Sequence, residues 1–566
     1  MYISSGGPPI HRRQTPQGPA TLRAHVLGPH PLIRHVLDLT QFEAIARACL
    51  GAARQGVLDH AQTLTVLVHN ILVSPAPLYR IAEWAAPLAP SALGLTPAQK
   101  AALNDDRVAR ALDALGSERG RNLWFRLALR VLKRFALQTD RLHFDTTTVT
   151  FAGAYAGSVS EPRITHGYNK DHRPDLKQLL FGLTVTADGA VPVLHRIWSG
   201  NRTDDRVHRT NLEALRTLLG RADFIYVADS KLCTRDNLAE LARHGGKFVT
   251  VLPRSRREDR RFREQLRRHA VRWTTIAVMP NHRRRDDPPD VFRSCASPAR
   301  TDDDFRLVWV RSSHKAEEDH RIREARLERA ELALAELAPR LNRRGLRRRA
   351  AIRQAVRTLL RPDGLEPFLD VQIQRYEEVT TRRLRRGRPR ATDPVVRVVR
   401  PRWRLTVTRS QEALARQART DGVFPLVTNL DRTPKKELLL IYKYQPYVEK
   451  RFAHYKTDLE IAPVYLKKPR RVAALLDAYF VALMLDALLE RRLRAAMGAA
   501  GLAELPVLPE GRPTKTPTTP RLLEVFGNIT WHEFERGEDR VTFPVRLTPL
   551  QQRLLRLLGV EKELYG

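Results

Sequence analysis

The sequence predicts an α/β fold: a mixed sheet with flanking helices, interrupted by an inserted domain and preceded by a helical N-terminal domain. Segments typical of strands and of helices alternate between residues 141 and 253. The alternation fails between 254 and 419, where arginine-rich segments and a long charged helix (about 316–338) appear. Apolar strand character resumes at 420. Such alternation is typical of a sheet covered by helices, and its interruption indicates an insertion.

Six consecutive parts are expected from these changes of character. They are a disordered leader (1–22), a helical N-terminal domain (23–140), the first part of the core (141–253), an arginine-rich insertion (254–419), the second part of the core (420–499) and a C-terminal tail (500–566).

The core elements follow from local patterns. RLHFDTTTVTFAG alternates and is rich in Thr and Val, which predicts a strand. QLLFGLTVTADGAVPVLHRIW predicts a hairpin with Asp188-Gly189 in its turn. DFIYVADS predicts a short strand that ends in Asp229. In the second part of the core, helices are expected at about 435–457 and 470–497.

Charge is the most unusual feature of the composition. The 566 residues include 98 Lys and Arg against 62 Asp and Glu, a net charge of +36. A field of this sign attracts polyanions, although a merely soluble surface or a ribosome-associated protein would share it. The three cysteines are too widely spaced for a disulfide framework or a zinc site, which fits a reducing cytoplasm. Asp477 and Asp486 interrupt the most apolar stretch, so a buried helix is expected there and no membrane association.

The excess of positive charge is concentrated in one segment. Residues 340–404 contain 20 arginines, no lysine and six acids, a composition suited to contacts with the phosphate backbone. Within it, Arg386, Arg388 and Arg390 alternate with Gly387 and Pro389. An extended R-G-R-P segment can lie in a narrow minor groove, and a basic loop is the alternative.

Two acids stand in strand contexts where a carboxylate is costly. Asp145 lies inside the Thr-rich strand, and Asp229 ends the apolar strand that follows. Carboxylates in such places need a partner or a cation, although each alone is more often a cap or a turn residue. Mg²⁺ prefers oxygen ligands, and two ions can activate an attacking oxygen and stabilise a leaving one.

A third acid, Glu449, lies in a predicted helix that follows the returning strand. Tyr442, Gln445, Glu449 and Lys456 are spaced three, four and seven apart, so they share one helix face, and Pro446 would start or kink the helix. A polar face of this kind is unusual for core packing, and an ordinary solvent face is the alternative.

These residues resemble the DDE transposases of bacterial insertion sequences, which have a ribonuclease-H-like catalytic fold. The chain is most similar to the insertion-sequence-four superfamily, whose signature is Y-x-x-R-x-x-x-E-x-x-x-x-x-x-K. Tyr442, Glu449 and Lys456 match that frame, and Gln445 departs from it where the signature has Arg. The stretches HGYNKDHRPDLKQLLFGL and SGNRTDD also resemble parts of the family.

The resemblance implies a two-metal transposase. Asp145, Asp229 and Glu449 would be the catalytic residues and would hold Mg²⁺, with Mn²⁺ as an alternative. Tyr442, Gln445 and Lys456 would contact DNA, and the helical N-terminal domain (23–140), which resembles that of the family, would help to recognise the element ends. The partners implied are double-stranded DNA, as element ends and as target, and a second copy of the chain in the DNA complex, with no nucleotide cofactor.

Some members of the superfamily stack a flipped base on an aromatic residue of the inserted domain. Trp309 and Trp403 are the candidates here, but both lie in strand-like segments, so core packing is expected for them. Three alternative functions remain open: a ribonuclease-H-like nuclease that only hydrolyses, a transposase-derived DNA-binding protein that has lost catalysis, and a basic nucleoid or RNA-binding protein.

Overall fold

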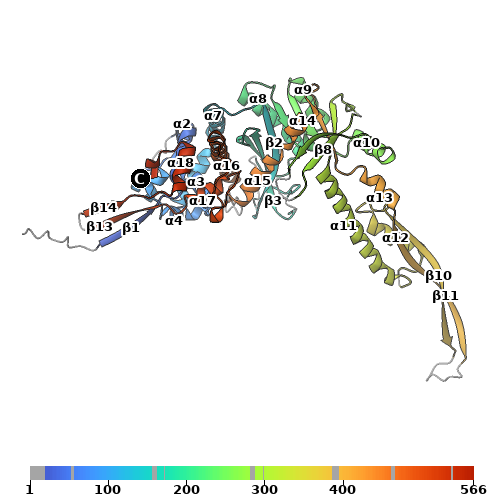
Figure 1. Ribbon diagram of the computed structural model, residues 1–566. Coiled ribbons are helices and arrows are strands. Elements are labelled where there is room, and N and C mark those ends of the chain that lie inside the picture. The colour runs from blue at the N-terminus through green and yellow to red at the C-terminus, as the bar shows by residue number, and fades with distance from the viewer. Residues whose placement is uncertain are drawn as a thin grey trace, which may run out of the picture. The chain divides into compact units, whose positions relative to one another are not determined.

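The chain folds as two compact units (Figure 1). One unit joins Met1–Phe248 to Ile441–Gly566, and the other, Val249–Leu440, interrupts it in sequence. The computed structural model describes residues 20–51, 57–153, 155, 162–170, 173–280, 287–296, 299–343, 345–384, 394–459, 466–536 and 539–565.

The N-terminal part of the first unit is helical, as expected. Its α-helices are α1 (His30–Thr40), α2 (Phe42–Leu50), α3 (His60–Val73), α4 (Ile81–Ala85), α5 (Pro97–Ala101), α6 (Asp105–Leu115) and α7 (Glu118–Arg134). Local signals explain where they start: Asp59 and Gln62 form a reciprocal capping box at the beginning of α3. The short helices η1 (Leu78–Arg80) and η2 (Pro90–Leu93) connect them.

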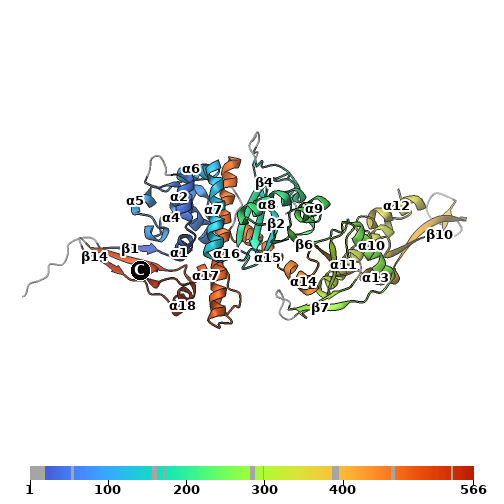
Figure 2. The same cartoon turned by 90° about the horizontal axis from the view of Figure 1, so that it is seen from above.

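A long apolar helix, α16 (Pro469–Ala499), forms the centre of this helical part. It packs against α3 and α6, and α6 and α16 are labelled in Figure 2. By length and composition alone α16 could cross a membrane, but 89% of its apolar window is buried inside the structure. A helix that is apolar on all sides is a core helix when its neighbours are protein. The expectation of a buried helix is therefore confirmed.

The first unit also contains the strands that the sequence predicts. They are β2 (Arg141–Phe151), β3 (Lys177–Thr186), β4 (Pro192–Ser199) and β5 (Ile225–Val227). β3 pairs antiparallel with β2 and with β4, and β5 pairs parallel with β2. The order is β4-β3-β2-β5, followed by β6 (Lys247–Val251). Both faces of β2 are largely buried, which suits its apolar and β-branched residues.

Helices complete the α/β arrangement around these strands. α8 (Asp204–Leu219) and α9 (Arg235–Arg243) lie between β4 and β6 in sequence, with the short helix η3 (Ser230–Leu232) after β5. α15 (Pro446–Thr457) contacts β2 and β3. The fold class, a mixed sheet with flanking helices, is thus confirmed.

The structure corrects one helix of the second part of the core. A single helix was expected over about 435–457, but α14 (Lys435–Lys443) ends before Tyr444, and α15 begins at Pro446. Proline has no backbone N–H and is favoured at a first helical position, so Pro446 starts a new helix.

The interrupting unit has a second group of strands, in the order β6-β12-β9-β8-β7. They are β7 (Thr274–Met279), β8 (Asp290–Ser294), β9 (Arg306–Ser312) and β12 (Val423–Thr428). β12, the strand expected from residue 420 onward, is present and pairs antiparallel with β6 along three positions and with β9 along six. Trp309 is fully buried in β9 with its ring 3.9 Å from that of Phe262, which confirms core packing.

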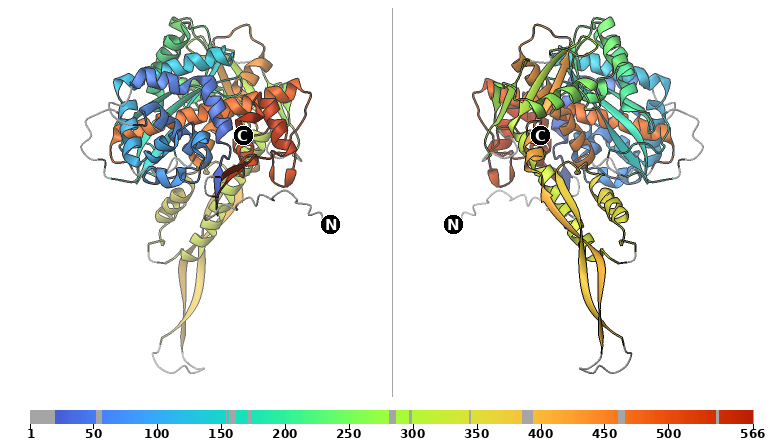
Figure 3. Two further views of the ribbon diagram at one scale, coloured as in Figure 1. Left: turned by 90° about the vertical axis from the view of Figure 1, so that its left-hand side faces the viewer. Right: turned by 90° about the vertical axis from the view of Figure 1, so that its right-hand side faces the viewer.

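A long hairpin extends from the helices of the interrupting unit (Figure 3). β10 (Leu369–Arg383) and β11 (Val395–Arg409) pair without a break over 15 positions. Only the base of the hairpin packs, against a core made largely by α11 (Ser313–Leu337) and α12 (Arg349–Leu360). The outer half is exposed on both faces. The remaining helices of this unit are α10 (Arg257–Arg268), α13 (Gln411–Ala418) and η4 (Ala338–Arg340).

The tail returns to the beginning of the chain. It contains η5 (Pro509–Gly511), α17 (Thr519–Val525), β13 (Thr530–Arg536), β14 (Asp539–Phe543), α18 (Pro549–Leu558) and η6 (Lys562–Tyr565). β13 pairs antiparallel with β1 (Ala20–Val26), from Ala20 opposite Arg536 to Val26 opposite Thr530. The leader was expected to extend to residue 22, but residues 20–22 are part of this strand. Residues 1–19 lie outside the described part of the chain.

Candidate active site

The first predicted acid, Asp145, lies in the middle of β2. Its side chain is 20% exposed, and Oδ1 accepts a 2.7 Å hydrogen bond from the backbone N–H of Thr146. The ammonium of Lys170 lies 3.7 Å from the same oxygen. Lys170 is fixed there because it also donates to the carbonyl and the hydroxyl of Thr146, at 2.6 and 2.8 Å.

The second acid, Asp229, lies two residues beyond β5. It caps η3 by accepting a 3.0 Å hydrogen bond from the N–H of Lys231. The parallel register places His143 opposite Val227, so two residues further along Asp229 comes level with Asp145. Neighbouring parallel strands therefore bring the two carboxylates to the same place in the sheet.

The third acid, Glu449, lies in the first turn of α15 and is exposed. α15 packs on the two strands β2 and β3 through Val448, Phe452 and Tyr455, which are buried. Lys456 is seven residues after Glu449, so two helical turns place both on one side of the helix, and its side chain is half-buried.

The electrostatic surroundings of Asp145 and of Tyr442 include all three acids. Burial raises the pKa of Asp145 to about 7; Lys170 opposes this shift, and Asp229 and Glu449 add to it. Tyr442, in the last turn of α14, reports the same cluster. Burial raises the pKa of its phenol, and Asp229, Glu449 and Asp145 each raise it further. Asp229 and Glu449, which are more than 200 residues apart in the sequence, thus both affect the phenol of Tyr442.

The donor set suits a hard divalent cation. Mg²⁺ is usually held by one or two carboxylates together with waters and substrate phosphates, and excess negative charge around Asp145 is what a cation would relieve. Among the residues that the structure describes, no group of three or more His, Cys, Asp and Glu side chains is close enough to hold a metal ion. Water and phosphate oxygens would complete the coordination of a cation held by these carboxylates.

Gln445 was expected to contact DNA, and the structure places it elsewhere. It is 5% exposed. Its Nε2 donates to the carbonyl of Phe144 at 2.8 Å, and its Oε1 lies 3.1 Å from Nδ1 of His143. Both ends of the amide are therefore used inside the protein, on the two residues that precede Asp145. The break between α14 and α15 turns Gln445 into the strand.

The remaining predicted residues lie in different surroundings. Tyr442 is half-buried, and the acids affect its pKa; Lys456 lies two turns after Glu449 on the same side of α15. Arg386, Arg388 and Arg390 lie outside the described residues. Trp403 is in β11, and its indole N–H donates to the carbonyl of Arg347 at 3.0 Å.

Sequence reasoning missed two groups of residues. Lys170 follows the first acid in the stretch HGYNKDHR, and its only signal was a lysine among polar residues near a strand. The second group ties α15 to α16: Arg451 binds Asp486 and Glu490, at 2.5 and 2.9 Å. Its signal was two acids inside an otherwise apolar helix, which require a buried cation.

Comparisons with known proteins add little beyond the geometry. Residues 25–129 match the model of a domain of unknown function, DUF4277, which lies wholly in the helical N-terminal part. No curated protein sequence matches the chain. A solved structure, a cryo-EM piggyBac transposase synaptic complex with hairpin DNA, aligns over 89% of this chain and 81% of that chain. The alignment has 7% identity and a TM-score of 0.38, so it carries no argument about activity.

Proposed function

We propose that the chain is a DNA transposase whose active centre is formed by Asp145, Asp229 and Glu449. The observation that supports this most directly is the parallel pairing of β2 with β5, which brings Asp145 level with Asp229, next to the helix that carries Glu449. The strand order β4-β3-β2-β5-β6, with β3 antiparallel and β5 parallel to β2, adds support, because it suits a ribonuclease-H-like core.

Mg²⁺ or Mn²⁺, held by these acids, would activate water and neutralise the charge that develops on the phosphate. Asp145 has to lose its proton before it can act as a ligand, and Lys170 favours that loss. Lys456 and Tyr442 are positioned near Glu449 and would bind phosphate oxygens of the scissile strand. Gln445 fixes α15 to the strand that carries Asp145.

The reaction has two steps that balance without an energy source. Water attacks a phosphodiester at the element end, the P–O3′ bond breaks, and a 3′-OH and a 5′-phosphate result. That 3′-OH then attacks a second phosphodiester, in the opposite strand or in target DNA, so one bond forms and one breaks. Pairing of two element ends in this step implies a homodimer on DNA.

The decisive substitution is Asp229→Ala. It removes one of the acids and leaves the strands intact, so cleavage of a duplex made from the DNA on either side of the gene should fall by at least about 1,000-fold, while the affinity of the protein for that duplex changes less than about threefold. Asp223→Ala is the matched control, because Asp223 pairs with Arg221 at the surface just before the same strand. Cleavage that persists in Asp229→Ala would refute the assignment.

A second readout separates a transposase from a nuclease that only hydrolyses. The wild-type chain is incubated with an element end and a labelled target duplex, and covalently joined product is measured. Joined product with a free 3′-OH as its precursor is the expected result. Complete cleavage without any joining would assign the site to hydrolysis alone.

A further inference from the structure

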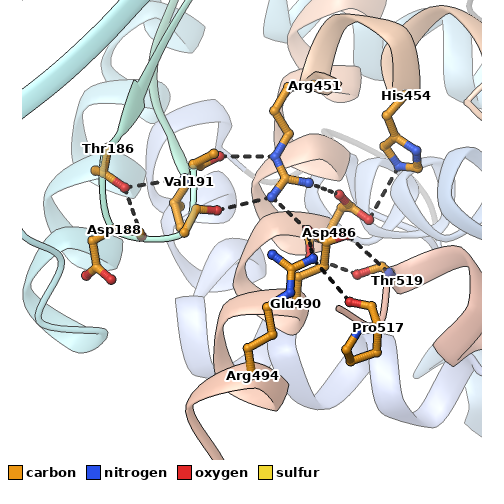
Figure 4. Close-up of polar contacts among 12 residues, drawn as sticks. Thr186, Asp188, Val191, Arg451, His454, Asp486, Glu490, Arg494, Pro517 and Thr519 are labelled. Carbon is orange, nitrogen blue, oxygen red and sulfur yellow. Dashed lines mark hydrogen bonds and ion pairs between the residues drawn. The ribbon is translucent and has the colours of Figure 1, made fainter. Parts of the chain in front are cut away.

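The helix that carries Glu449, α15, has polar side chains on two opposite flanks. One residue advances an α-helix by about 100°, so Glu449 and Lys456 lie on one flank of α15, and Arg451 and His454 lie on the other. The buried residues Val448, Phe452 and Tyr455 lie between them. The flank opposite Glu449 faces α16 and the turn between β3 and β4 (Figure 4).

Arg451 connects three elements on this flank. Its guanidinium donates to Asp486 at 2.5 Å and Glu490 at 2.9 Å, both on α16. It also donates to the carbonyls of Ala190 and Gly189, at 3.1 and 3.2 Å, in the turn that follows β3. Its side chain is only 8% exposed. A planar guanidinium with four such acceptors fixes orientation as well as distance.

The partners of Arg451 are themselves held in place. The carboxylate of Asp486 is 1% exposed, and His454 lies 3.4 Å from its other oxygen. The hydroxyl of Thr519 donates to the backbone carbonyl of Asp486 at 2.8 Å. Arg494 lies 3.3 Å from Glu490. Arg451 therefore binds a preorganised acceptor, which we define as the Asp486–Glu490 pair.

On this flank of α15, the polar contacts of Arg451 are not backed by close apolar packing. A cavity of about 520 Å³ borders the same flank of α15 and is lined by Tyr444, Tyr447, Arg451, His454 and Glu490 among others. Buried ion pairs contribute little net stability, because desolvation offsets the attraction. Their better attested effect is to select one geometry. A network this buried beside a cavity is thus suited to fixing how α15 is rotated.

We propose that Arg451, through the Asp486–Glu490 pair and the turn after β3, positions α15 and thereby sets where Glu449 stands relative to Asp145 and Asp229. Arg451 is a positioning residue, because its side chain binds Asp486, Glu490 and the turn after β3 and acts on Glu449 through the helix α15. This inference rests on the proposed function of Glu449. Gln445 ties the start of α15 to β2, and Arg451 ties its middle to α16, so together they fix both the place and the rotation of a helix of 12 residues.

The test compares Arg451→Met with the wild type in the full chain. Mn²⁺ binding, measured by electron paramagnetic resonance without DNA, should weaken by about 10- to 100-fold, the usual effect of removing a residue that orients a metal ligand. The Mg²⁺ concentration that half-saturates cleavage should rise in parallel, while affinity for the DNA duplex stays unchanged. Amide hydrogen exchange in Pro446–Thr457 should become faster. Arg451→Lys should recover part of the Mn²⁺ affinity, since lysine keeps the charge.

The matched control is Arg491→Met. Arg491 lies on α16 and, like Arg451, binds the turn after β3. It donates to Asp188 at 3.0 and 2.7 Å and to the carbonyl of Phe135 at 3.1 Å, and none of these partners is on α15. Arg491→Met should lower the melting temperature without changing Mn²⁺ affinity. If Arg451→Met does not fold, the same measurements are made on Glu490→Gln, which weakens one acceptor of Arg451 and leaves Asp486 in place.

The two possible failures are distinguishable. If Arg451→Met binds Mn²⁺ as the wild type does and exchange in α15 is unchanged, the positioning role is refuted, whether or not the chain cleaves DNA. If the wild type binds Mn²⁺ and loses that binding in Arg451→Met but never cleaves an element end, the proposed function fails and the positioning role stands.

Discussion

At the scale of single residues, the surroundings of Asp145 disfavour its ionised form. Burial, Asp229 and Glu449 raise its pKa to about 7, and Lys170 compensates only in part. A carboxyl in this state is neutral over much of the range in which ordinary aspartates are ionised. The ionised carboxylate is therefore destabilised, and binding of a cation or of a proton removes this electrostatic penalty.

This strain predicts how Asp145→Asn changes stability with pH. Because the folded pKa is raised, the folded chain binds more protons than the unfolded chain between about pH 4 and 7, and the aspartate lowers stability increasingly across that window. The stabilisation gained by the substitution should therefore grow by about 2–3 kcal/mol between pH 5 and pH 8. Urea unfolding in a metal chelator measures it, and a gain that is equal at both pH values would contradict the shift.

At the scale of elements, the break between α14 and α15 decides what the signature residues do. The periodicity of the sequence put Tyr442, Gln445, Glu449 and Lys456 on one face, as though one helix continued. The break at Tyr444 instead turns Gln445 into β2, where it binds His143 and Phe144. Helical spacing predicted Glu449 and Lys456 together because both lie within α15, and it misjudged Gln445 because that residue precedes the helix.

Gln445→Ala should accordingly act on stability. It leaves the carbonyl of Phe144 and the ring of His143 without their partner in a buried place, so the free energy of unfolding should fall by about 2–4 kcal/mol. DNA affinity of the folded protein, measured by fluorescence anisotropy well below the melting temperature, should be unchanged. Weaker DNA binding at full stability would restore a direct contact between Gln445 and DNA.

At the scale of the whole molecule, the sequence predicted elements better than it predicted their long-range partners. Alternation in 141–253 identifies the strands and helices of the core because burial imposes it locally. The pairing of β12 with β9 and the ion pairs of Arg451 join distant segments, and no local pattern records such contacts. The three acids could be named because Asp145 and Asp229 are carboxylates in strand contexts and Glu449 lies on an unusually polar helix face. Lys170 could not, because a lysine among polar residues is ordinary.

The hairpin β10–β11 carries a prediction of its own, because its outer half packs on nothing in the described chain. Replacing Val379–Val399 by Asn-Gly removes seven arginines and one acid and leaves the base of the hairpin paired. The slope of log affinity for DNA against log salt should become shallower by up to about 6, at about 0.9 for each phosphate that the protein no longer neutralises. A full-length hairpin with the seven arginines changed to glutamine is the control and should show the same change. An unchanged slope would exclude the hairpin as a phosphate-binding arm.

The pairing of β1 with β13 has a consequence for how the protein is made. β1 leaves the ribosome about 500 residues before its partner does, which at 5–20 residues per second means a delay of roughly 25 to 100 seconds. During that time β1 has an unpaired edge, a feature that invites association with other strands. Formation of this sheet therefore waits until residues 530–536 have been synthesised, and a nascent chain halted before Thr530 would leave β1 open to binding by chaperones.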